Sequence, residues 1–133
     1  MRVVVVGSGR LGSRLASIFA KKGDSVLVIE QNESKFMYIE EKQGIEMLVG
    51  DCTDEKVIRQ AIKKPADLVI VVTGNDHTNI MISQKIKLID KTIRVIMRLF
   101  DVNLAAVYAD LGIEVLCPTS LAIDELLRLP GIS

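Results

Sequence analysis

Six short runs of apolar, mostly β-branched residues alternate along the chain with segments in which apolar residues recur at helical spacing. The runs cover residues 3–6, 26–29, 47–49, 68–72, 95–97 and 115–117. A near-continuous apolar run is typical of a parallel strand that is covered on both faces. Parallel neighbours need crossover connections, which are almost always right-handed. The alternation therefore predicts an α/β fold with a doubly wound, six-stranded parallel sheet in the order 3-2-1-4-5-6 and helices on both faces.

The connecting segments are predicted to be helices, covering about residues 11–19, 33–41, 57–62, 80–89, 104–111 and 119–129. The second of these is a short and comparatively polar segment. Asp54 and Asp76 each precede a helical segment and are candidate N-caps, whereas Gly112 suits a helix end. At 133 residues, and with no linker or low-complexity tract, the chain is predicted to be a single domain spanning residues 1–133.

The first apolar run leads directly into a glycine-rich turn, Gly7-Ser8-Gly9-Arg10-Leu11-Gly12. This is G-x-G-x-x-G between a predicted strand and a predicted helix, the context that the dinucleotide-binding fingerprint of Rossmann-like folds requires. Gly7 would permit the tight turn, Gly9 would let a pyrophosphate approach the backbone, and Gly12 would let helix and strand pack closely. The helix N-terminus would then face the phosphates. The alternative is that the glycines only shape a tight turn.

Glu30 ends the second predicted strand, 23 positions after Gly7. An acidic residue at about this distance normally accepts hydrogen bonds from the hydroxyls of an adenosine ribose. A carboxylate there would repel a 2′-phosphate, which disfavours NADP. The pattern does not distinguish NAD from ATP, ADP or AMP, and a solvated strand-end glutamate is the alternative.

Polar residues follow the third, fourth and fifth strands, where the carboxyl edge of the sheet would bring them near a ligand. Asp51 could accept from an adenine amino group or bond within its own loop, and Cys52 is predicted to be a small packed residue. Thr73 and Gly74 would lie across the point at which strand order reverses. Arg98 could reach a phosphate, or pair at the surface with the nearby Asp101.

Charge and composition exclude several functional classes. Lysine and arginine number 17, as do aspartate and glutamate, so the net charge lacks the basic excess of a nucleic-acid binder. No apolar run approaches the length of about 20 residues that spans a bilayer, and no signal peptide is recognised, so a cytoplasmic location is expected. Neither a catalytic constellation nor a metal-ligand spacing is found, so the sequence favours a sensor over an enzyme.

The predicted helix over 119–129 has a broad apolar surface for an element at the edge of a small domain. Asp124, Glu125 and Arg128 group on one side of it, and Ala122, Ile123, Leu126, Leu127 and Leu129 fill most of the rest. Simple packing on the sheet is one interpretation. Burial against another chain is the other.

Taken in order, these segments resemble the N-terminal nucleotide-binding (RCK N or TrkA-N) domain of TrkA/KtrA-type potassium uptake regulators. The motifs that show the resemblance are Val4-Val5-Val6 with the glycine-rich turn, Val28-Ile29-Glu30, Gly50-Asp51-Cys52-Thr53, Thr73-Gly74-Asn75-Asp76 with Asn79, Met97-Arg98, and Gly112-Ile113-Glu114-Val115-Leu116-Cys117-Pro118. The resemblance covers essentially the whole chain. The arginine within the glycine turn and the Gly-Asp-x-Thr after the third strand are its more specific parts.

The resemblance implies residue roles and partners. Phosphates would lie on the turn residues Gly7, Ser8, Gly9, Arg10, Leu11 and Gly12, the ribose on Glu30, the adenine near Asp51 and Cys52, and the far side of the ligand against Thr73, Gly74 and Arg98. It also implies a cytoplasmic subunit that binds NAD(H) or an adenine nucleotide and forms dimers or larger rings on a membrane potassium transporter, with helix 119–129 contacting a neighbouring subunit.

Some features depart from the family. Many members carry aspartate at the position of Glu30, and a residue such as alanine is common at Cys52; the glutamate slightly favours adenine nucleotides. The usual C-terminal ligand-binding lobe lies outside this sequence. Three functions are therefore weighed: a regulatory nucleotide sensor for potassium transport, the detached NAD-binding domain of an oxidoreductase, and a nucleotide-independent assembly module.

Overall fold

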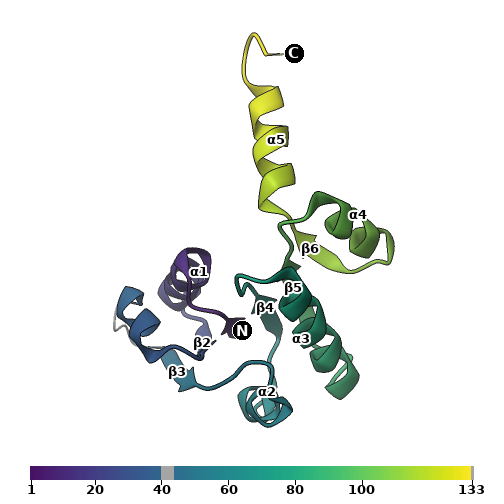
Figure 1. The fold of residues 1–133 in the computed structure, drawn as a ribbon. Coiled ribbons are helices and arrows are strands. Elements are labelled where there is room, and N and C mark those ends of the chain that lie inside the picture. Colours follow the sequence, from purple (N-terminus) through teal and green to yellow (C-terminus); the bar gives the residue numbers. More distant parts are fainter. Residues whose placement is uncertain (40–43, 133) are drawn as a thin grey trace.

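A single parallel sheet of six strands organises the described part of the chain (Figure 1). The computed structural model describes residues 1–39 and 44–132. The strands are β1 (Arg2–Val6), β2 (Ser25–Glu30), β3 (Ile45–Val49), β4 (Leu68–Val71), β5 (Arg94–Arg98) and β6 (Glu114–Leu116). They pair in the order β3-β2-β1-β4-β5-β6, and every pairing is parallel. The predicted fold class and strand order are confirmed.

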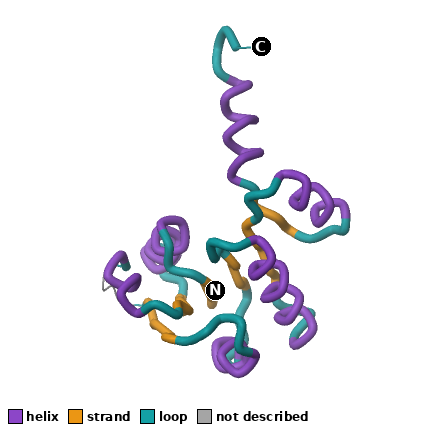
Figure 2. Tube along the Cα trace, in the orientation of Figure 1, coloured by secondary structure: helices purple, strands orange, loops and turns teal. Residues whose placement is uncertain are grey.

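Helices connect consecutive strands (Figure 2). They are α1 (Arg10–Lys21), the 3₁₀ helix η1 (Glu33–Tyr38), α2 (Glu55–Ile62), α3 (Asp76–Ile89), α4 (Val102–Asp110) and α5 (Pro118–Arg128). The helix predicted over 33–41 is present as a 3₁₀ helix that ends at Tyr38, and residues 40–41 of the predicted range lie outside the described residues. Phe36 and Ile39 are its buried apolar anchors, and their i,i+3 spacing suits the three-residue turn of a 3₁₀ helix.

The two faces of the sheet are covered by different helices. Val3 and Val5 of β1 face the side on which α1 and η1 lie, and Val4 and Val6 face the side of α2, α3 and α4. All four valines are buried. The central strands therefore have the predicted cover on both faces, with two apolar cores separated by the sheet.

The edge strands lack this double cover. Met47 and Val49 of β3 are 39% and 50% exposed, and no residue of β6 is buried. The prediction that every strand is covered on both faces is thus wrong at the two edges. The physical reason is position, since an edge strand has a neighbour on one side only and lies at the limit of the helical layers.

The helix caps differ from the sequence prediction at one position. Asp54 caps α2 as predicted, by accepting a hydrogen bond from Lys56 N. The N-cap of α3, however, is Asn75, whose side chain accepts from Thr78 N. The neighbouring Asp76 instead accepts from the backbone N–H groups of Phe100 and Asp101, at 2.8 and 2.9 Å. Asp76 therefore joins the start of α3 to the loop that follows β5.

The terminal helix α5 projects away from the sheet (Figure 1). None of its residues is buried, and its leucines at 121, 126 and 127 and isoleucine at 123 are each 49–54% exposed. Packing of this helix on the sheet is therefore excluded in the described chain. Within the described residues no helix combines the length and the apolar character needed to cross a membrane.

Candidate functional site

A cleft of about 440 Å³ lies at the carboxyl edge of the sheet, where the strand order reverses between β1 and β4. Open α/β sheets bind ligands at this switch point. The cleft brings together most of the residues singled out in the sequence: Gly7, Gly9, Glu30, Asp51, Cys52, Thr73, Gly74 and Arg98. These residues come from the ends of five strands, β1 to β5, and the loops that follow them, so their proximity depends on the parallel arrangement.

The glycine-rich turn has the geometry that its sequence requires. Gly7 has φ of +102°, a left-handed conformation that favours glycine. A Cβ at Gly12 would lie 2.0 Å from the Gly7 carbonyl oxygen, because α1 passes very close to the turn. A Cβ at Gly9 would meet no atom within 4 Å. Gly7 and Gly12 therefore shape the turn, whereas Gly9 leaves open space on the cleft side.

The start of α1 has no side-chain cap. Gly9 occupies the N-cap position, and no acidic residue lies in the first turn. By contrast, Asn32, Asp54, Asn75 and Asp101 cap η1, α2, α3 and α4 with side-chain oxygens. The open N–H groups and the positive end of the helix dipole are suited to an anion.

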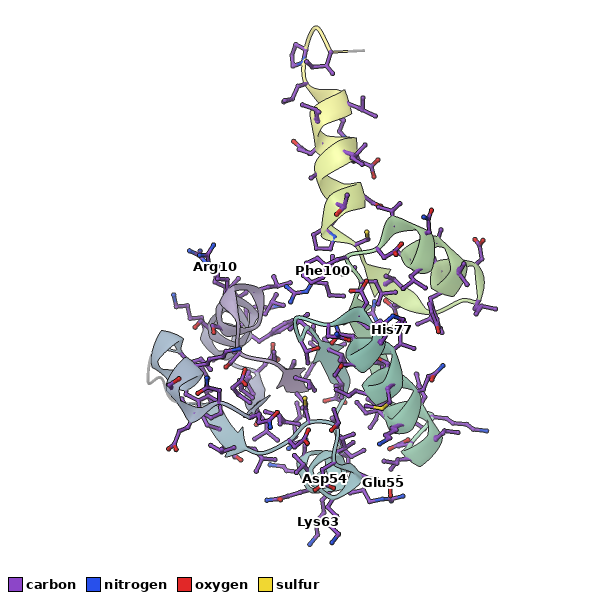
Figure 3. The ribbon with its side chains drawn as sticks, in the orientation of Figure 1. Arg10, Asp54, Glu55, Lys63, His77 and Phe100 are labelled. Atoms are coloured by element: carbon purple, nitrogen blue, oxygen red, sulfur yellow. The ribbon has the colours of Figure 1, made fainter. Side chains whose placement is uncertain are left out.

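Four turn residues lie outside the cleft. Ser8 is fully buried, and Gly12 is enclosed where α1 meets the strand. Leu11 packs against the core on the α1 side of the sheet. Arg10 is exposed and points outward (Figure 3), beside an adjoining hollow of about 510 Å³ that Gly9 and Lys35 share with the cleft. Arg10 and Lys35 thus place positive charge next to the turn.

Glu30 ties the end of β2 to the glycine-rich turn. Its Oε1 accepts from Ser8 N at 3.1 Å and Ser8 Oγ at 3.0 Å, and its Oε2 accepts from Asn32 N at 3.0 Å. Burial raises the pKa of this carboxyl, but the hydrogen bonds from Asn32 and Ser8 and the charge of Lys35 outweigh burial, so the pKa lies below its ordinary value of 4.5. The ionised form is therefore the one that fits the turn.

This lowered pKa predicts how stability depends on pH. Because the folded-state pKa of Glu30 is depressed, its contribution is complete above pH 4.5 and is lost as pH falls through the folded value. We expect Glu30→Gln to destabilise the protein by about 1 kcal/mol at pH 7, a partly exposed carboxylate being screened by solvent. The difference should shrink in acid. Urea unfolding of both proteins from pH 7 to pH 3 measures it, and a constant gap across that range would contradict the assignment.

The loop after β3 bonds within itself. Asp51 Oδ1 accepts from Thr53 N at 2.9 Å and Thr53 Oγ1 at 2.6 Å, and these bonds lower the pKa of the Asp51 carboxyl. Local bonding, one of the two roles considered for Asp51, is therefore present while the residue also lines the cleft. Burial and the charge of Asp51 raise the pKa of the Cys52 thiol, which stays protonated and packs against the core.

Asn79 organises the opposite wall of the cleft from within α3. It is fully buried, and its Oδ1 accepts from both Thr73 N and Thr73 Oγ1. Its Nδ2 donates to the carbonyl oxygens of Thr73, at 3.1 Å, and Arg98, at 2.8 Å. One side chain thereby holds the ends of β4 and β5 together. No role for Asn79 was predicted from the sequence, because most of its partners are backbone groups that no residue spacing reveals.

Arg98 reaches across the end of β4. Its Nη2 donates to the carbonyl oxygens of Val72 and Thr73, both at 3.0 Å, and its guanidinium lies 4.6 Å from the ring centre of Phe100. Burial lowers the pKa of Arg98, and the charge of Asp76 opposes that shift. The alternative surface pair with Asp101 is not formed, since Asp101 caps α4 instead. Nε of Arg98 is buried and finds no partner within residues 1–39 and 44–132.

Several cleft residues were not predicted from the sequence: Ile29, Gln31, Lys35, Val72 and Thr78. Lys35 comes from η1, and its charge acts on Glu30. No motif marks it, because the polar helix that carries it has no sequence signature of its own. Lys35 comes close to the glycine-rich turn only because η1 packs beside α1.

The fold and the cleft together define the class of domain to which this chain belongs. The chain is a Rossmann-like domain with a glycine-rich turn at the start of α1 and an acidic residue at the end of β2. The family model for the TrkA-N domain matches residues 3–118, and the chain belongs to the TrkA-N domain family.

The proteins that resemble this chain in sequence are named as potassium uptake proteins. A Trk system potassium uptake protein TrkA homolog of Pyrococcus abyssi (strain GE5 / Orsay) is 33% identical over 101 residues, which are 76% of this chain and 44% of that protein. Trk system potassium uptake protein TrkA of Streptomyces coelicolor is 28% identical over 128 residues, 96% of this chain and 57% of that protein. The chain thus spans about half the length of these relatives.

Solved structures show the same fold. The TrkA-N domain of inner membrane protein ybaL from Escherichia coli superposes with a TM-score of 0.84 at 21% identity, covering 97% of this chain and 96% of that one. The Kef C-terminal domain of Shewanella denitrificans in its AMP-bound form has a TM-score of 0.80 at 17% identity, covering 96% and 79%. GsuK bound to ADP has a TM-score of 0.77 at 24% identity, covering 96% and 34%.

Proposed function

We propose that this chain is the nucleotide-binding regulatory part of a membrane potassium uptake system. The observation that carries the proposal is the cleft at the switch point, in which an uncapped helix start, an open Gly9 and the Glu30 carboxylate face one space. The sequence relatives are named as potassium uptake proteins, which supports a role in potassium transport. Two structural neighbours are described with bound AMP or ADP, which supports an adenine nucleotide as the ligand class. The role is regulatory and not enzymatic.

The proposed ligand is NAD(H) or an adenine nucleotide, ATP, ADP or AMP. Its phosphates would lie at Gly7, Gly9 and the start of α1, with Arg10 at the rim. Oε1 of Glu30 already accepts two hydrogen bonds from Ser8, whereas Oε2 accepts one, from Asn32 N, and so keeps a lone pair that can accept from a ribose hydroxyl. Asp51 and Cys52 would lie against the adenine, and Thr73, Gly74 and Arg98 would bound the other side.

The carbonyl contacts of Arg98 suit a phosphate-sensing role. Its Nη2 is held by two carbonyl oxygens, and its Nε is buried and has no partner among the described residues. A phosphate in the cleft would offer this guanidinium a stronger, charge-assisted partner than a neutral carbonyl. Arg98 would then move relative to Phe100, on which it stacks.

Phe100 connects the cleft to α5. Its carbonyl oxygen accepts from Thr119 Oγ1 at 3.5 Å, and its N–H donates to Asp76 at the start of α3. A movement of Arg98 that displaces Phe100 would therefore change the contact between Phe100 and Thr119 in the first turn of α5. Two nucleotides that place Arg98 differently would favour different orientations of α5, and each could shift that equilibrium only by its differential affinity for the two states.

Isothermal titration of the purified protein with NAD, NADH, ATP, ADP and AMP tests the proposal. Glu30→Ala serves as the cleft variant, and Glu114→Ala, which removes an exposed carboxylate at the far edge of the sheet, is the matched control. We expect saturable binding of at least one ligand, weakened about tenfold in Glu30→Ala and unchanged in Glu114→Ala. No binding by the folded protein would favour the assembly module, and turnover of NADH with any partner chain would favour the oxidoreductase.

We also propose that α5 packs against a second copy of this chain in a homodimer or larger ring, located at the cytoplasmic membrane face through the transporter. Its exposed apolar side chains support this, because a solvated helix rarely presents so broad an apolar surface.

Charged substitutions on α5 should break this association. We expect Ile123→Glu with Leu127→Glu to weaken self-association at least about tenfold, because a carboxylate buried in an apolar contact loses its hydration. Asp124→Asn on the polar side of the same helix is the control. Sedimentation velocity across a protein dilution series measures the effect, and a wild type that stays monomeric at every concentration would refute the proposal.

A further inference from the structure

A lysine of α3 holds the loop that follows β3. Nζ of Lys85 donates to the carbonyl oxygen of Thr53 at 3.1 Å, although the two residues are 32 positions apart in the chain. In the described part of the chain, this is the one hydrogen bond that joins residues 51–53 to another element of the fold. Lys85 is half-buried and lies outside the lining of the cleft, whereas residues 51–53 line it. Lys85 therefore acts on the cleft through the loop.

One side of α3 borders both the cleft and this loop. Thr78, which lines the cleft, lies seven positions before Lys85. Residues seven apart in an α-helix lie on the same side of the helix. Helix α3 also packs against α2, and the loop leads into the start of α2. The packing of α3 beside α2 therefore places the lysine side chain within reach of the loop.

Thr53 connects Lys85 to the carboxylate of Asp51. The N–H and the hydroxyl of Thr53 donate to Oδ1 of Asp51, at 2.9 and 2.6 Å, while the carbonyl oxygen of Thr53 accepts from Lys85. The bonds from Thr53 lower the pKa of the Asp51 carboxyl, and the charge of Lys85 adds to that shift. Because both bonds end on Oδ1, Oδ2 is left to accept from a ligand. The orientation of this ionised carboxylate thus depends on where Thr53 is held.

An ionised carboxylate accepts hydrogen bonds and donates none, which makes it selective among purine bases. Adenine presents a 6-amino group that can donate to it, whereas hypoxanthine presents a carbonyl oxygen that it would repel. We propose that Lys85 is a positioning residue for base recognition, because it holds Thr53 and thereby directs Asp51 at the 6-amino group of adenine. This inference rests on the proposed function, in which the adenine lies against Asp51 and Cys52.

Paired titrations of adenine and hypoxanthine nucleotides measure this role. ADP is paired with IDP, and NAD with nicotinamide hypoxanthine dinucleotide, so the members of each pair differ only in the base. We expect the wild type to bind the adenine member at least about tenfold more tightly, because it gains a charge-assisted hydrogen bond where the other member meets a repulsion. The readout is the ratio of the two dissociation constants, which a general weakening of the cleft leaves unchanged.

Substitutions of Lys85 separate positioning from packing. Lys85→Met keeps most of the apolar stem of the side chain but removes the ammonium group, and we expect the ratio to fall to about threefold. Lys85→Arg can still donate to the Thr53 carbonyl oxygen, and we expect it to keep the ratio within about twofold of the wild-type value. Thermal unfolding of each variant checks that the compared proteins are folded.

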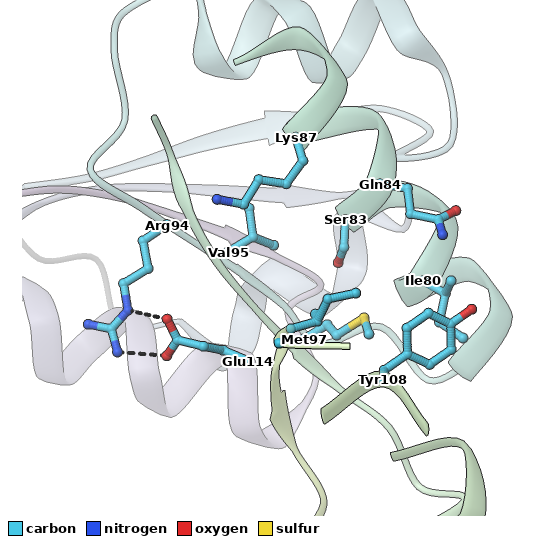
Figure 4. Close-up of a pocket in the computed structure, with 11 residues that line it drawn as sticks. Ile80, Ser83, Gln84, Lys87, Arg94, Val95, Met97, Tyr108 and Glu114 are labelled. Carbon is cyan, nitrogen blue, oxygen red and sulfur yellow. Dashed lines mark hydrogen bonds and ion pairs between the residues drawn. The ribbon is translucent and has the colours of Figure 1, made fainter. Parts of the chain in front are cut away.

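Lys87→Met is the matched control. Lys87 belongs to the same helix, and its Nζ also donates to backbone carbonyl oxygens, those of Lys91 and Ile93. It lines a cavity of about 330 Å³ that opens between α3 and α4 (Figure 4). Among the described residues, this cavity shares none of its lining with the nucleotide cleft. We therefore expect Lys87→Met to leave the ratio unchanged.

Asp51→Asn tests the base contact itself. The side-chain carbonyl oxygen of the variant can still accept from Thr53, while its amide nitrogen presents a donor in place of Oδ2. An amide donor favours the carbonyl oxygen of hypoxanthine over the amino group of adenine. We therefore expect the preference for the adenine member of each pair to be lost in this variant.

Two results would overturn the inference and leave the proposed function intact. One is a wild type that binds both members of a pair equally well. The other is a folded Lys85→Met protein that binds both members more weakly by the same factor, which would mean that Lys85 only stabilises the loop. Failure of the folded wild type to bind any of these nucleotides would overturn the proposed function and the inference together.

Discussion

Gly12→Ala is expected to destabilise the protein by about 4 kcal/mol, which would lower Tm by roughly 15 °C. The new Cβ would lie 2.0 Å from the Gly7 carbonyl oxygen and 3.3 Å from Cγ2 of Val72. The first of these atoms belongs to the backbone, so relief requires α1 to move away from β1. That movement would disturb the buried contacts of Ala16 and of the α1 side of the core.

Thermal unfolding followed by circular dichroism measures this effect. Gly9→Ala is the matched control, because it makes the same change three residues earlier, where φ is −66° and no atom lies within 4 Å of the added Cβ. It should leave Tm within about 2 °C of the wild type. Equal destabilisation by the two variants would mean that the close approach at Gly12 is not what limits the turn.

Gly9→Asp is expected to leave the fold intact while raising the nucleotide dissociation constant at least about 100-fold. The side chain would project into the open space beside the start of α1, where the phosphates are proposed to lie. It would add a negative charge against the ligand and offer the uncapped N–H groups of α1 a carboxylate in place of a phosphate. Both effects oppose phosphate binding, and the capping effect favours the folded protein.

Titration with the nucleotide that binds the wild type best gives the measurement, and thermal unfolding of the same samples checks the fold. Gly9→Ala again provides the control for bulk without charge, and we expect it to weaken binding less than Gly9→Asp. Unchanged affinity in a stable Gly9→Asp protein would place the ligand elsewhere and remove the phosphate role of the turn.

Local sequence patterns were sufficient to predict the fold and about half of the residues that line the cleft. The apolar runs predicted all six strands to within two residues at each end. In the central strands the runs reflect burial on both faces of the sheet. The tight turn at Gly7 and Gly12 and the position of Glu30 at the end of β2 follow from local sequence for a similar reason. A tight strand–turn–helix with an acid at the end of the next strand is constrained within about 30 residues of chain.

The errors arose where a residue has more than one possible partner. Asp76 and Asn75 are both good N-caps, and only the position of the β5–α4 loop decides that Asp76 bonds to Phe100 and Asp101. Likewise, Arg98 could pair with Asp101 or turn toward β4. Asp101 instead caps α4, and Arg98 donates to the carbonyl oxygens of Val72 and Thr73.

The sheet, its strand order and the glycine-rich turn can be predicted from local sequence, since each depends on residue types at short, regular spacing. Three features became visible only in the folded chain: Asn79 joins the ends of β4 and β5, α5 projects away from the sheet, and α3 and α4 leave a cavity between them. These features are set by the relative placement of elements that are distant along the chain. The spacing of side chains within one helix or strand does not predict that placement.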